Sequence, residues 1–322
     1  MALNINYIAQ LSPLVHSGGG ELIMRRLIET GEKRGHRFAF ATASPRAEKL
    51  FINPDLTILT DVFNSPYTLR RLSPSLLERV LAQGRFIHFD NAYVDTCNLD
   101  YLPCQGSKSV YCQQKLGLSP LKRLLSRDFS GHCFQEKPLV KALYQRSLCN
   151  VFLSPLHHRV ISKMLGLEGK DAIIVKPLID EGLFYDRRME RDLEYLFVGV
   201  IGEAKGLAEM RLRFGDRNIH FVGKIAKGER LDFGTYLGAV PYAEIPVYMN
   251  RARNFVFLPR WPEPQGRVVV EAAMCGCHLI CNDNVGALSF DFSVACPEHY
   301  RNADAEFWQE LENRMARQPC TG

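Results

Sequence analysis

The feature of the sequence that most constrains its fold is a regular alternation of short β-like runs with helical patterns. In the first half, the β-like runs NINYIAQ, RFAFATA and LTILTDV are separated by segments with helical periodicity, among them residues 21–33 and 74–83. After residue 186 the alternation restarts with EYLFVGV, NIHFVGK, NFVFLP and CHLICN. Strands that alternate with helices are typical of parallel sheets covered by helices on both faces. Two such series predict an α/β chain with two doubly wound, Rossmann-like domains.

The length of the chain suits two domains. With 322 residues, it is too long for one small domain and about right for two. We predict a first domain at residues 1–180 and a second at 181–300, with the linker near PLIDEGLFYD. Residues 301–322 include AEFWQELENRMARQ, whose amphipathic pattern predicts a last helix able to pack back across the domains. Ligands of open parallel sheets bind at the carboxyl ends of the strands, so two facing domains would enclose a central cleft.

Composition and cysteine content narrow the class of protein. Apolar residues make up 46% of the chain, which is enough for substantial cores. No apolar run approaches the roughly 18 residues that span a bilayer, and the start does not resemble a signal peptide. The ten cysteines form no CxxC pair, so we expect reduced thiols that pack as small hydrophobic side chains. These observations predict a cytoplasmic protein without a transmembrane segment, and leave peripheral contact with a membrane open.

The charge balance is mildly basic. The formal net charge is +5, and the segments MRRLIETGEKRGHR, LKRLLSRD and MRLRFGDR concentrate part of it. Such an excess suits an anionic ligand or acceptor, but it is too weak to establish nucleic-acid binding. A solvated helix face is the simpler explanation of each basic segment.

Two glycine turns stand where strands end and helices begin. HSGGGE, residues 16–21, places Gly19 and Gly20 at a helix start, where the backbone can approach an anionic ligand closely. FVGVIGEAKG, residues 197–206, places Lys205 where its ammonium can reach a phosphate at the carboxyl edge of a sheet. A plain glycine turn and a surface lysine are the alternatives, and neither segment decides between them by itself.

The stretch NFVFLPRWPEPQGRVVVEA is predicted to be a strand, a loop and a helix. Its two prolines exclude regular helix before Gln265, so Glu263 lies on the loop and the helix begins near Gly266. The first amides of the helix lack intrahelical partners and suit a phosphate oxygen or sugar hydroxyls. Further along the helix, the carboxylate of Glu271 can accept two hydrogen bonds from a vicinal diol such as a ribose. The alternative is an unconnected loop acid and a solvent-facing helical acid.

Together these segments resemble the retaining GT-B glycosyltransferases of family 4. The family's motif is a glutamate, seven residues and a second glutamate followed by Ala and a small-residue turn, and it stands here as EPQGRVVVEAAMCGCHLI. FVGVIGEAKG is similar to the family's phosphate-lysine turn, and VKPLIDEGLFYD to its interdomain segment. In the first half, SGGGELIMRRLIETGEKRGHRFAFAT is similar to its Gly-Gly loop, helix and following strand. The resemblance covers most of residues 16–290 and implies the GT-B fold, with the acceptor on the first domain and a nucleotide sugar on the second.

The resemblance implies two catalytic residues. Lys205 would neutralise the diphosphate leaving group, and Glu263 would contact the donor sugar. The family transfers glycosyl units with retention of configuration, so a nucleotide sugar is the expected co-substrate. It needs no obligatory metal, and neither a metal site nor a cofactor is expected here.

The resemblance also implies the donor-binding residues. The backbone amides of Gln265 and Gly266 would contact hydroxyls of the sugar, and that of Arg267 the phosphate. Glu271 would hold the ribose. From the first domain, Gly19 and Gly20 would approach the same diphosphate.

The chain departs from the family at two places. Family members usually carry an arginine five positions before the lysine, where this chain has Val200. We expect Arg267 or Arg260, at the helix start, to replace it. Many members also carry a histidine near the reaction centre in the first domain. Here the strand KSVYCQQ has Cys112 and Gln113 at that place.

Other acceptor-side candidates lie nearby in the first domain. They are His16 in HSGGG and the pair His88 and Asp90 in FIHFDN. A structural role is the alternative for each, and no general base is assigned. A retaining transfer needs none if the leaving phosphate takes the acceptor proton, as proposed for the family. The acceptor is expected to meet HSGGG, FDNAYVD and the basic loop at residues 113–135.

The sequence therefore predicts a retaining glycosyltransferase that uses a nucleotide sugar. The expected acceptor is a saccharide or lipid-linked hydroxyl, glycan or anionic in character, and a hydroxylated base of nucleic acid is the second hypothesis. A catalytically decayed scaffold that still binds nucleotide sugars is an alternative motivated by Val200. A nucleotide-sugar 2-epimerase, also of the GT-B fold, is disfavoured because those enzymes lack the Glu-x7-Glu pattern.

Overall fold

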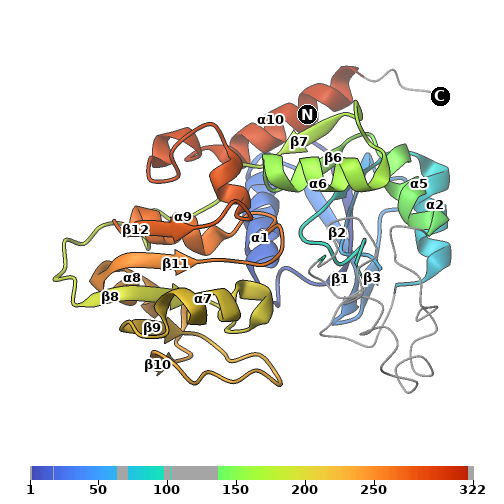
Figure 1. Cartoon of the computed structure of the whole chain (residues 1–322). Helices are drawn as coiled ribbons and strands as arrows, with labels where there is room; N and C mark the ends of the chain where they lie inside the picture. Colours follow the sequence, from blue (N-terminus) through green and yellow to red (C-terminus); the bar gives the residue numbers. More distant parts are fainter. Residues whose placement is uncertain (1, 17, 64–71, 98–101, 103–136, 318–322) are drawn as a thin grey trace. The chain divides into compact units, whose positions relative to one another are not determined.

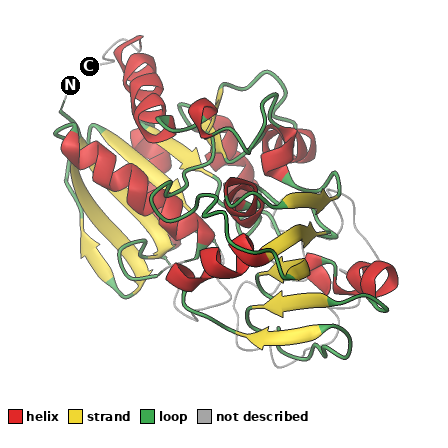
Figure 2. Cartoon of the chain, turned by 90° about the vertical axis from the view of Figure 1, so that its left-hand side faces the viewer, coloured by secondary structure: helices red, strands yellow, loops and turns green. Residues whose placement is uncertain are grey.

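The chain divides into two compact units (Figure 1). The computed structural model describes residues 2–16, 18–63, 72–97, 102 and 137–317. The first unit comprises Met1–Leu153, His158–Val175 and the chain from Asn302 onward, and the second comprises Ser154–His157 and Lys176–Arg301. Each unit is built on a mainly parallel sheet with helices beside it, as Figure 2 shows. The predicted fold class, two doubly wound Rossmann-like α/β units, is confirmed.

The sheet of the first unit has the strand order β3-β2-β1-β4-β5-β6-β7 in the described residues. Its strands are β1 (Asn4–Leu11), β2 (Arg37–Ser44), β3 (Ala47–Lys49), β4 (Leu56–Thr60), β5 (Phe86–Phe89), β6 (Asn150–Phe152) and β7 (Ala172–Ile174). All neighbouring pairs are parallel except β2 and β3. The central strands β1 and β4 are almost wholly buried, and their polar residues Asn6, Gln10, Thr57 and Thr60 are buried together with the apolar ones.

The described residues of the first unit form five helices. They are α1 (Gly19–Lys33), α2 (Pro74–Gln83), α5 (Pro138–Arg146), α6 (Pro155–Leu165), whose first residues group with the second unit, and α10 (Ala303–Arg317). In α2, Pro74 stands at the first helical position and Gly84 ends the helix with a φ of 72°, as the sequence predicts. The predicted cap Ser73 is at the N-cap position, but its hydroxyl lies 2.6 Å from that of Ser75 and makes no capping hydrogen bond.

Helices cover both faces of the first sheet. Consecutive residues of a strand point to opposite faces, and β5 illustrates this. The His88 ring lies 4.1 Å from that of Tyr144 on α5, whereas the Phe89 ring lies 6.1 Å from that of Phe307 on α10. The face toward α2 and α5 is filled by a core cluster of apolar side chains, made of Ile8, Ala41, Leu59, Val62, Leu77, Val80, Leu81, Phe86 and Leu143.

The last helix, α10, belongs to the first unit although it follows the second in the chain. Its Trp308 is fully buried, and the indole N–H donates to the Leu27 carbonyl of α1 at 2.8 Å. At one end of the contact, Asp304 accepts hydrogen bonds at 2.8 Å from both Arg26 and Thr30. At the other end, Glu312 pairs with Arg34 at 2.6 Å. Packing of α10 against α1 therefore explains the amphipathic pattern of the C-terminal sequence.

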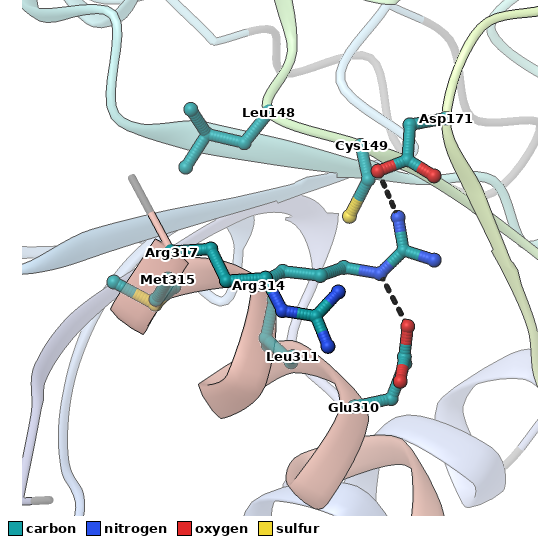
Figure 3. A pocket seen from close by; sticks show the side chains of 8 residues that line it. All are labelled: Leu148, Cys149, Asp171, Glu310, Leu311, Arg314, Met315 and Arg317. Carbon is teal, nitrogen blue, oxygen red and sulfur yellow. Dashed lines mark hydrogen bonds and ion pairs between the residues drawn. The ribbon is translucent and has the colours of Figure 1, made fainter. Parts of the chain in front are cut away.

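A cavity of about 260 Å³ lies between α10 and the residues just before β6 and β7. Figure 3 shows Arg314 reaching between two acids, and the cavity is lined by Leu148, Cys149, Asp171, Glu310, Leu311, Arg314, Met315 and Arg317. The Arg314 guanidinium pairs with Asp171 and lies 2.7 Å from Glu310. Burial raises the pKa of the Cys149 thiol to about 12, so this cysteine behaves as a small hydrophobic side chain.

We predict that Arg314→Ala destabilises the first unit by about 1 kcal/mol, because it removes both ion pairs and a bond to the Ala172 carbonyl at the edge of the sheet. Asp171 and Glu310 are about half exposed, which keeps the loss small. Thermal unfolding is expected to show a Tm lower by about 2–4 °C. Arg46→Ala is the control, since its pair with Glu48 is 72% and 64% exposed. Equal Tm values for the two variants would contradict the role of Arg314.

The second unit has the strand order β10-β9-β8-β11-β12, and all its described pairs are parallel. Its strands are β8 (Leu193–Val198), β9 (Ile219–Val222), β10 (Thr235–Gly238), β11 (Ala252–Phe257) and β12 (His278–Cys281). Its helices are α7 (Leu207–Phe214), α8 (Ile245–Arg251) and α9 (Arg267–Met274), with short 3₁₀ turns at Glu203–Lys205, Tyr242–Glu244, Gly286–Ser289 and Pro297–His299.

The structure differs from the sequence-based prediction at several elements. β3 and β10 lie at the edges of their sheets and were not predicted, because AEK in β3 is mostly charged and TYLG in β10 is exposed or half-buried, so neither forms a short apolar run. The predicted helix YAEIPVYMNRAR begins as a 3₁₀ turn, since Pro246 cannot lie deep inside an α-helix, and its last residues belong to β11. The predicted strand KSVYCQ lies outside the described residues. Among the helices that are described, none is long and apolar enough to cross a membrane.

Candidate functional site

The start of α9 has the local structure that its sequence predicts. Strand β11 ends at Phe257, a loop carries Glu263, and the helix begins at Arg267. Gly266 precedes the helix with a φ of 75°, and a Cβ there would lie 3.1 Å from Val285. Glycine therefore suits this position by conformation and by space. Val269 donates to the Gly266 carbonyl at 2.9 Å, and the amides before it precede the regular hydrogen-bond pattern of the helix.

Backbone hydrogen bonds fix the loop before α9. The amide of Glu263 donates to the Asn284 carbonyl at 2.7 Å, and its carbonyl accepts from Gly286 at 3.0 Å. The Gln265 carbonyl accepts from Ala287 at 2.6 Å. The Pro264 carbonyl accepts from the Ser154 hydroxyl at 2.5 Å. The loop is thus held at three successive residues, by residues 284–287 and by Ser154, which fixes the backbone position of Glu263.

The two residues expected to be catalytic lie together. The Lys205 ammonium donates to Oε2 of Glu263, although the residues are 58 positions apart in the chain. Their side chains are 23% and 14% exposed, so the pair is partly shielded and still open to solvent. Such a pair presents a positive charge and a hydrogen-bond acceptor side by side at the helix start.

Close backbone packing places Lys205 there. Gly206, which follows it, has a φ of 87°, and a Cβ would lie 1.9 Å from the Leu258 carbonyl oxygen. Only glycine lets this turn lie directly on the end of β11. The amide of Arg260 also donates to the Ala204 carbonyl at 3.2 Å, which joins the loop to the lysine turn.

Glu271 lies one turn inside α9 in a small polar cluster. It is 3% exposed, and its Oε1 accepts from the Tyr242 hydroxyl at 2.7 Å and from Arg267 at 3.2 Å. Arg267 also donates to the Tyr242 oxygen at 2.9 Å. Burial raises the pKa of Glu271 above its usual value, and Arg267 and Tyr242 oppose that shift. Burial, followed by the Glu271 carboxylate, raises the pKa of Tyr242 as well.

The two arginines expected to replace the family's arginine, which is absent at position 200, have different surroundings in the structure. The side chain of Arg267 is 13% exposed and engaged with Glu271, so its guanidinium belongs to the ribose end of the predicted site. Arg260 is 63% exposed and pairs with Glu203, in the same turn as Lys205. Val200 itself is 52% exposed. Arg260 is thus the arginine tied to the lysine turn.

Of the two candidate glycines of the first unit, Gly20 has a packing explanation and Gly19 has none. A Cβ on Gly20 would lie 2.6 Å from the side chain of Asn91, so this glycine is needed where α1 starts beside that residue. A Cβ on Gly19 would meet nothing within 4 Å. The His16 ring lies 3.2 Å from the Ser44 carbonyl, and its own carbonyl accepts from Arg25. The contact of Gly19 and Gly20 with a diphosphate stays a prediction.

The acceptor-side candidates His88 and Asp90 are buried in a hydrogen-bonded network. His88 is fully buried, with Nε2 3.1 Å from Asp95 Oδ2. Asp90 is 1% exposed and accepts from the Tyr144 hydroxyl at 2.5 Å. Such burial favours a structural role for both in this conformation. Residues 113–135, together with Cys112, lie outside the described residues.

The predicted site residues thus fall into two groups. Lys205, Glu263, residues 265–267 and Glu271 cluster around the start of α9 in the second unit, while the other candidates belong to the first. Over the described ranges, no group of three or more His, Cys, Asp or Glu side chains is arranged to hold a metal ion.

Sequence reasoning missed two aromatic residues of this cluster. Tyr242 bonds Glu271, and Trp261 lies beside Lys205 with its ring centroid 4.8 Å from the ammonium. Trp261 is one of two tryptophans in the chain and stands in a short loop beside Glu263, and its rarity is the sequence signal that could have marked it as a candidate. Tyr242 carries no comparable signal, because its contact with α9 depends on the packing of the turn before α8.

Comparison with known proteins identifies the fold. No protein-family model and no curated protein sequence matches the chain. The chain is similar to the crystal structure of Anabaena Alr3699/HepE in complex with UDP, with a TM-score of 0.55 and 15% identity over 97% of this chain and 92% of that one. The same protein in complex with UDP-glucose gives a TM-score of 0.55 at 13% identity, over 97% and 92% of the two chains.

The chain is similar in fold to a second solved protein. An α-glucosyltransferase in complex with UDP and a 13-mer DNA containing a HMU base matches with a TM-score of 0.51 and 11% identity, over 98% of this chain and 91% of that one. At such identities the likeness establishes the fold. The two Rossmann-like units are those of the GT-B glycosyltransferase fold, as the resemblance implies.

Proposed function

We propose that the chain is a glycosyltransferase that moves a sugar from a UDP-sugar, with UDP-glucose as the first candidate, to a hydroxyl of an acceptor. The observation that carries the proposal is the Lys205–Glu263 pair at the start of α9, where a cation, a carboxylate and the first amides of a helix lie together. The UDP and UDP-glucose complexes of the structurally similar proteins support the choice of donor.

The proposed chemistry needs a site that stabilises a leaving diphosphate. The bond between the anomeric carbon and the phosphate oxygen breaks, and negative charge grows on UDP. Lys205 and the first amides of α9, up to that of Arg267, would stabilise that charge. The Glu263 carboxylate would accept hydrogen bonds from hydroxyls of the sugar, and the amides of Gln265 and Gly266 would donate hydrogen bonds to sugar oxygens. Glu271 would accept from the ribose hydroxyls.

Retention of configuration and independence of metal belong to the same proposal. The protein's own cation takes the place of a metal at the diphosphate. The leaving phosphate would take the proton of the acceptor hydroxyl on the face where the new bond forms, so no separate base is required. The deep burial of His88 and Asp90 is consistent with this, because neither is placed to meet an acceptor hydroxyl in this conformation.

For the acceptor, we favour a saccharide or lipid-linked hydroxyl. A hydroxylated base in DNA is the second candidate, and one observation favours it: the fold match to an α-glucosyltransferase that binds DNA containing a HMU base. Transfer of label from UDP-glucose to DNA with hydroxymethylated bases, compared with glycans and lipid-linked sugars, separates the two. A DNA acceptor would also bind less tightly as salt rises.

The test of the proposed function is release of UDP from UDP-glucose in the presence of these acceptors. We predict that Glu263→Ala lowers kcat/KM for UDP-glucose about 10- to 100-fold, the effect of losing hydrogen bonds between a carboxylate and the sugar. Affinity for UDP, which lacks the sugar, is expected to be unchanged or tighter, since Lys205 then loses a competing anion.

Glu209→Ala is the matched control, because this acid of the same unit is 46% exposed on α7 and pairs only with its helix neighbour Arg213 among the ion pairs described. Full activity of Glu263→Ala would refute the role of Glu263. Wild-type protein that binds UDP-glucose but turns over none of the acceptors would favour the alternative of a catalytically decayed scaffold.

A further inference from the structure

The surroundings of the Lys205 ammonium include two aromatic rings as well as an acid. Its Nζ lies 4.8 Å from the centroid of Trp261 and 5.6 Å from that of Phe257. Both distances fall within the roughly 6 Å over which a ring face attracts a cation. The third neighbour is the carboxylate of Glu263. The lysine is therefore held between a short loop and the end of β11.

The rings are themselves fixed in place. Trp261 is 7% exposed, which is low for a side chain on a loop. Its loop is bonded on both sides, through the amide of Arg260 to Ala204 and through that of Glu263 to Asn284. Phe257 is 2% exposed and stacks on Phe197 of the neighbouring strand, with centroids 6.1 Å apart. Both rings offer the lysine a rigid support.

The acid and the rings act differently on the lysine. Glu263 neutralises the ammonium, and it is also the residue proposed to bind hydroxyls of the sugar. An aromatic face attracts the ammonium through its quadrupole and leaves the positive charge in place. When Glu263 turns to the sugar, the rings are the part of the contact that can keep the lysine in position.

We propose that Trp261 is a positioning residue that holds the Lys205 ammonium toward the diphosphate while Glu263 is engaged with the sugar. The inference rests on the proposed function for the identity of the ligand. Trp261 acts through the lysine, so its contribution to donor binding should require the positive charge at position 205.

The experiment is a double-substitution cycle with UDP as the probe, measured by calorimetric titration. Trp261→Met removes the ring and keeps much of the volume, whereas Trp261→Phe keeps an aromatic face. We expect Trp261→Met to weaken UDP binding about fivefold, which corresponds to about 1 kcal/mol, and Trp261→Phe about twofold. In the Lys205→Gln background, Trp261→Met should change the dissociation constant of UDP by less than twofold.

The inference is overturned if Trp261→Met weakens UDP binding as much with Gln at position 205 as with Lys, or if Trp261→Phe is as damaging as Trp261→Met. A second readout needs no ligand. The cost of Trp261→Met in Tm should be smaller in the Lys205→Gln background, and an equal cost would count against the contact. If wild-type protein binds no UDP, the proposed function fails, and the Tm cycle still decides whether Trp261 holds the lysine.

Discussion

Replacing Lys205 by glutamine is expected to lower kcat for sugar transfer about 100- to 1,000-fold, the usual cost of removing one group that stabilises charge in a transition state. The side chain is 23% exposed and bonded to Glu263, so its charge acts in a partly shielded place. Affinity for UDP should fall as well, but less than kcat, because charge on the leaving group is greatest in the transition state. Initial rates of UDP release and calorimetric titration measure the two effects.

The matched control is Lys227→Gln, which removes an exposed lysine from the same unit and should leave both constants unchanged. Lys205→Arg should recover part of the rate, since the charge is kept while its position changes. A Lys205→Gln protein that folds normally and transfers sugar within threefold of the wild-type rate would contradict the proposed role of the lysine.

Replacing Glu271 by alanine is expected to weaken UDP binding about 10- to 100-fold, because the ribose loses a charged acceptor of two hydrogen bonds. The substitution also leaves Tyr242 and Arg267 without the carboxylate that orients them. Titration with UDP measures the loss. Glu244→Ala, on an exposed acid close to Tyr242 in the chain, is the control and should bind UDP like the wild type.

Glu271 is expected to favour UDP binding, but it should lower the stability of the ligand-free protein. Burial raises the pKa of Glu271 in the folded protein, so the folded state favours the protonated form more than the unfolded state does. The resulting decrease in the free energy of unfolding is absent below the ordinary pKa of the carboxyl. It grows as the pH rises toward the raised pKa and is complete above it. Glu271→Gln should therefore raise the Tm of the ligand-free protein at pH 8, with a smaller gain toward pH 4.

The Glu271→Gln variant distinguishes a functional role of the carboxylate from a structural one. A Glu271→Gln protein that is more stable and binds UDP more weakly fits a carboxylate kept for its ligand. If it melted at a lower temperature than the wild type at pH 8 and bound UDP equally well, Glu271 would be a structural residue instead.

Much of the fold could be predicted because the signals are local. Strand and helix periods repeat along the chain, and the start of α9 follows from Pro262, Pro264 and Gly266 without knowledge of any distant contact. The short edge strands β3 and β10 give no such pattern. They form because a neighbouring strand offers them hydrogen bonds.

The candidate site was predictable only in part, because local sequence patterns do not show contacts between distant segments. The residues around α9 follow the spacing of the family motif. The ion pair of Lys205 with Glu263, the ring of Trp261 and the hydroxyl of Tyr242 depend on contacts between segments far apart in sequence. The burial of His88 depends likewise on α5 packing over β5, and a histidine at the end of a strand does not reveal it.

The central claim is that the start of α9 binds the donor, and a thermal-shift titration with UDP-, GDP- and ADP-sugars tests it most directly. A donor at 100 times its Kd stabilises the folded protein by about 2.7 kcal/mol, which raises Tm by about 5–10 °C. We predict such a shift for the wild type with UDP-glucose, and a much smaller one for the Lys205→Gln, Glu271→Ala double variant at the same concentration. No shift with any donor at millimolar concentration, or equal shifts for both proteins, would contradict the claim.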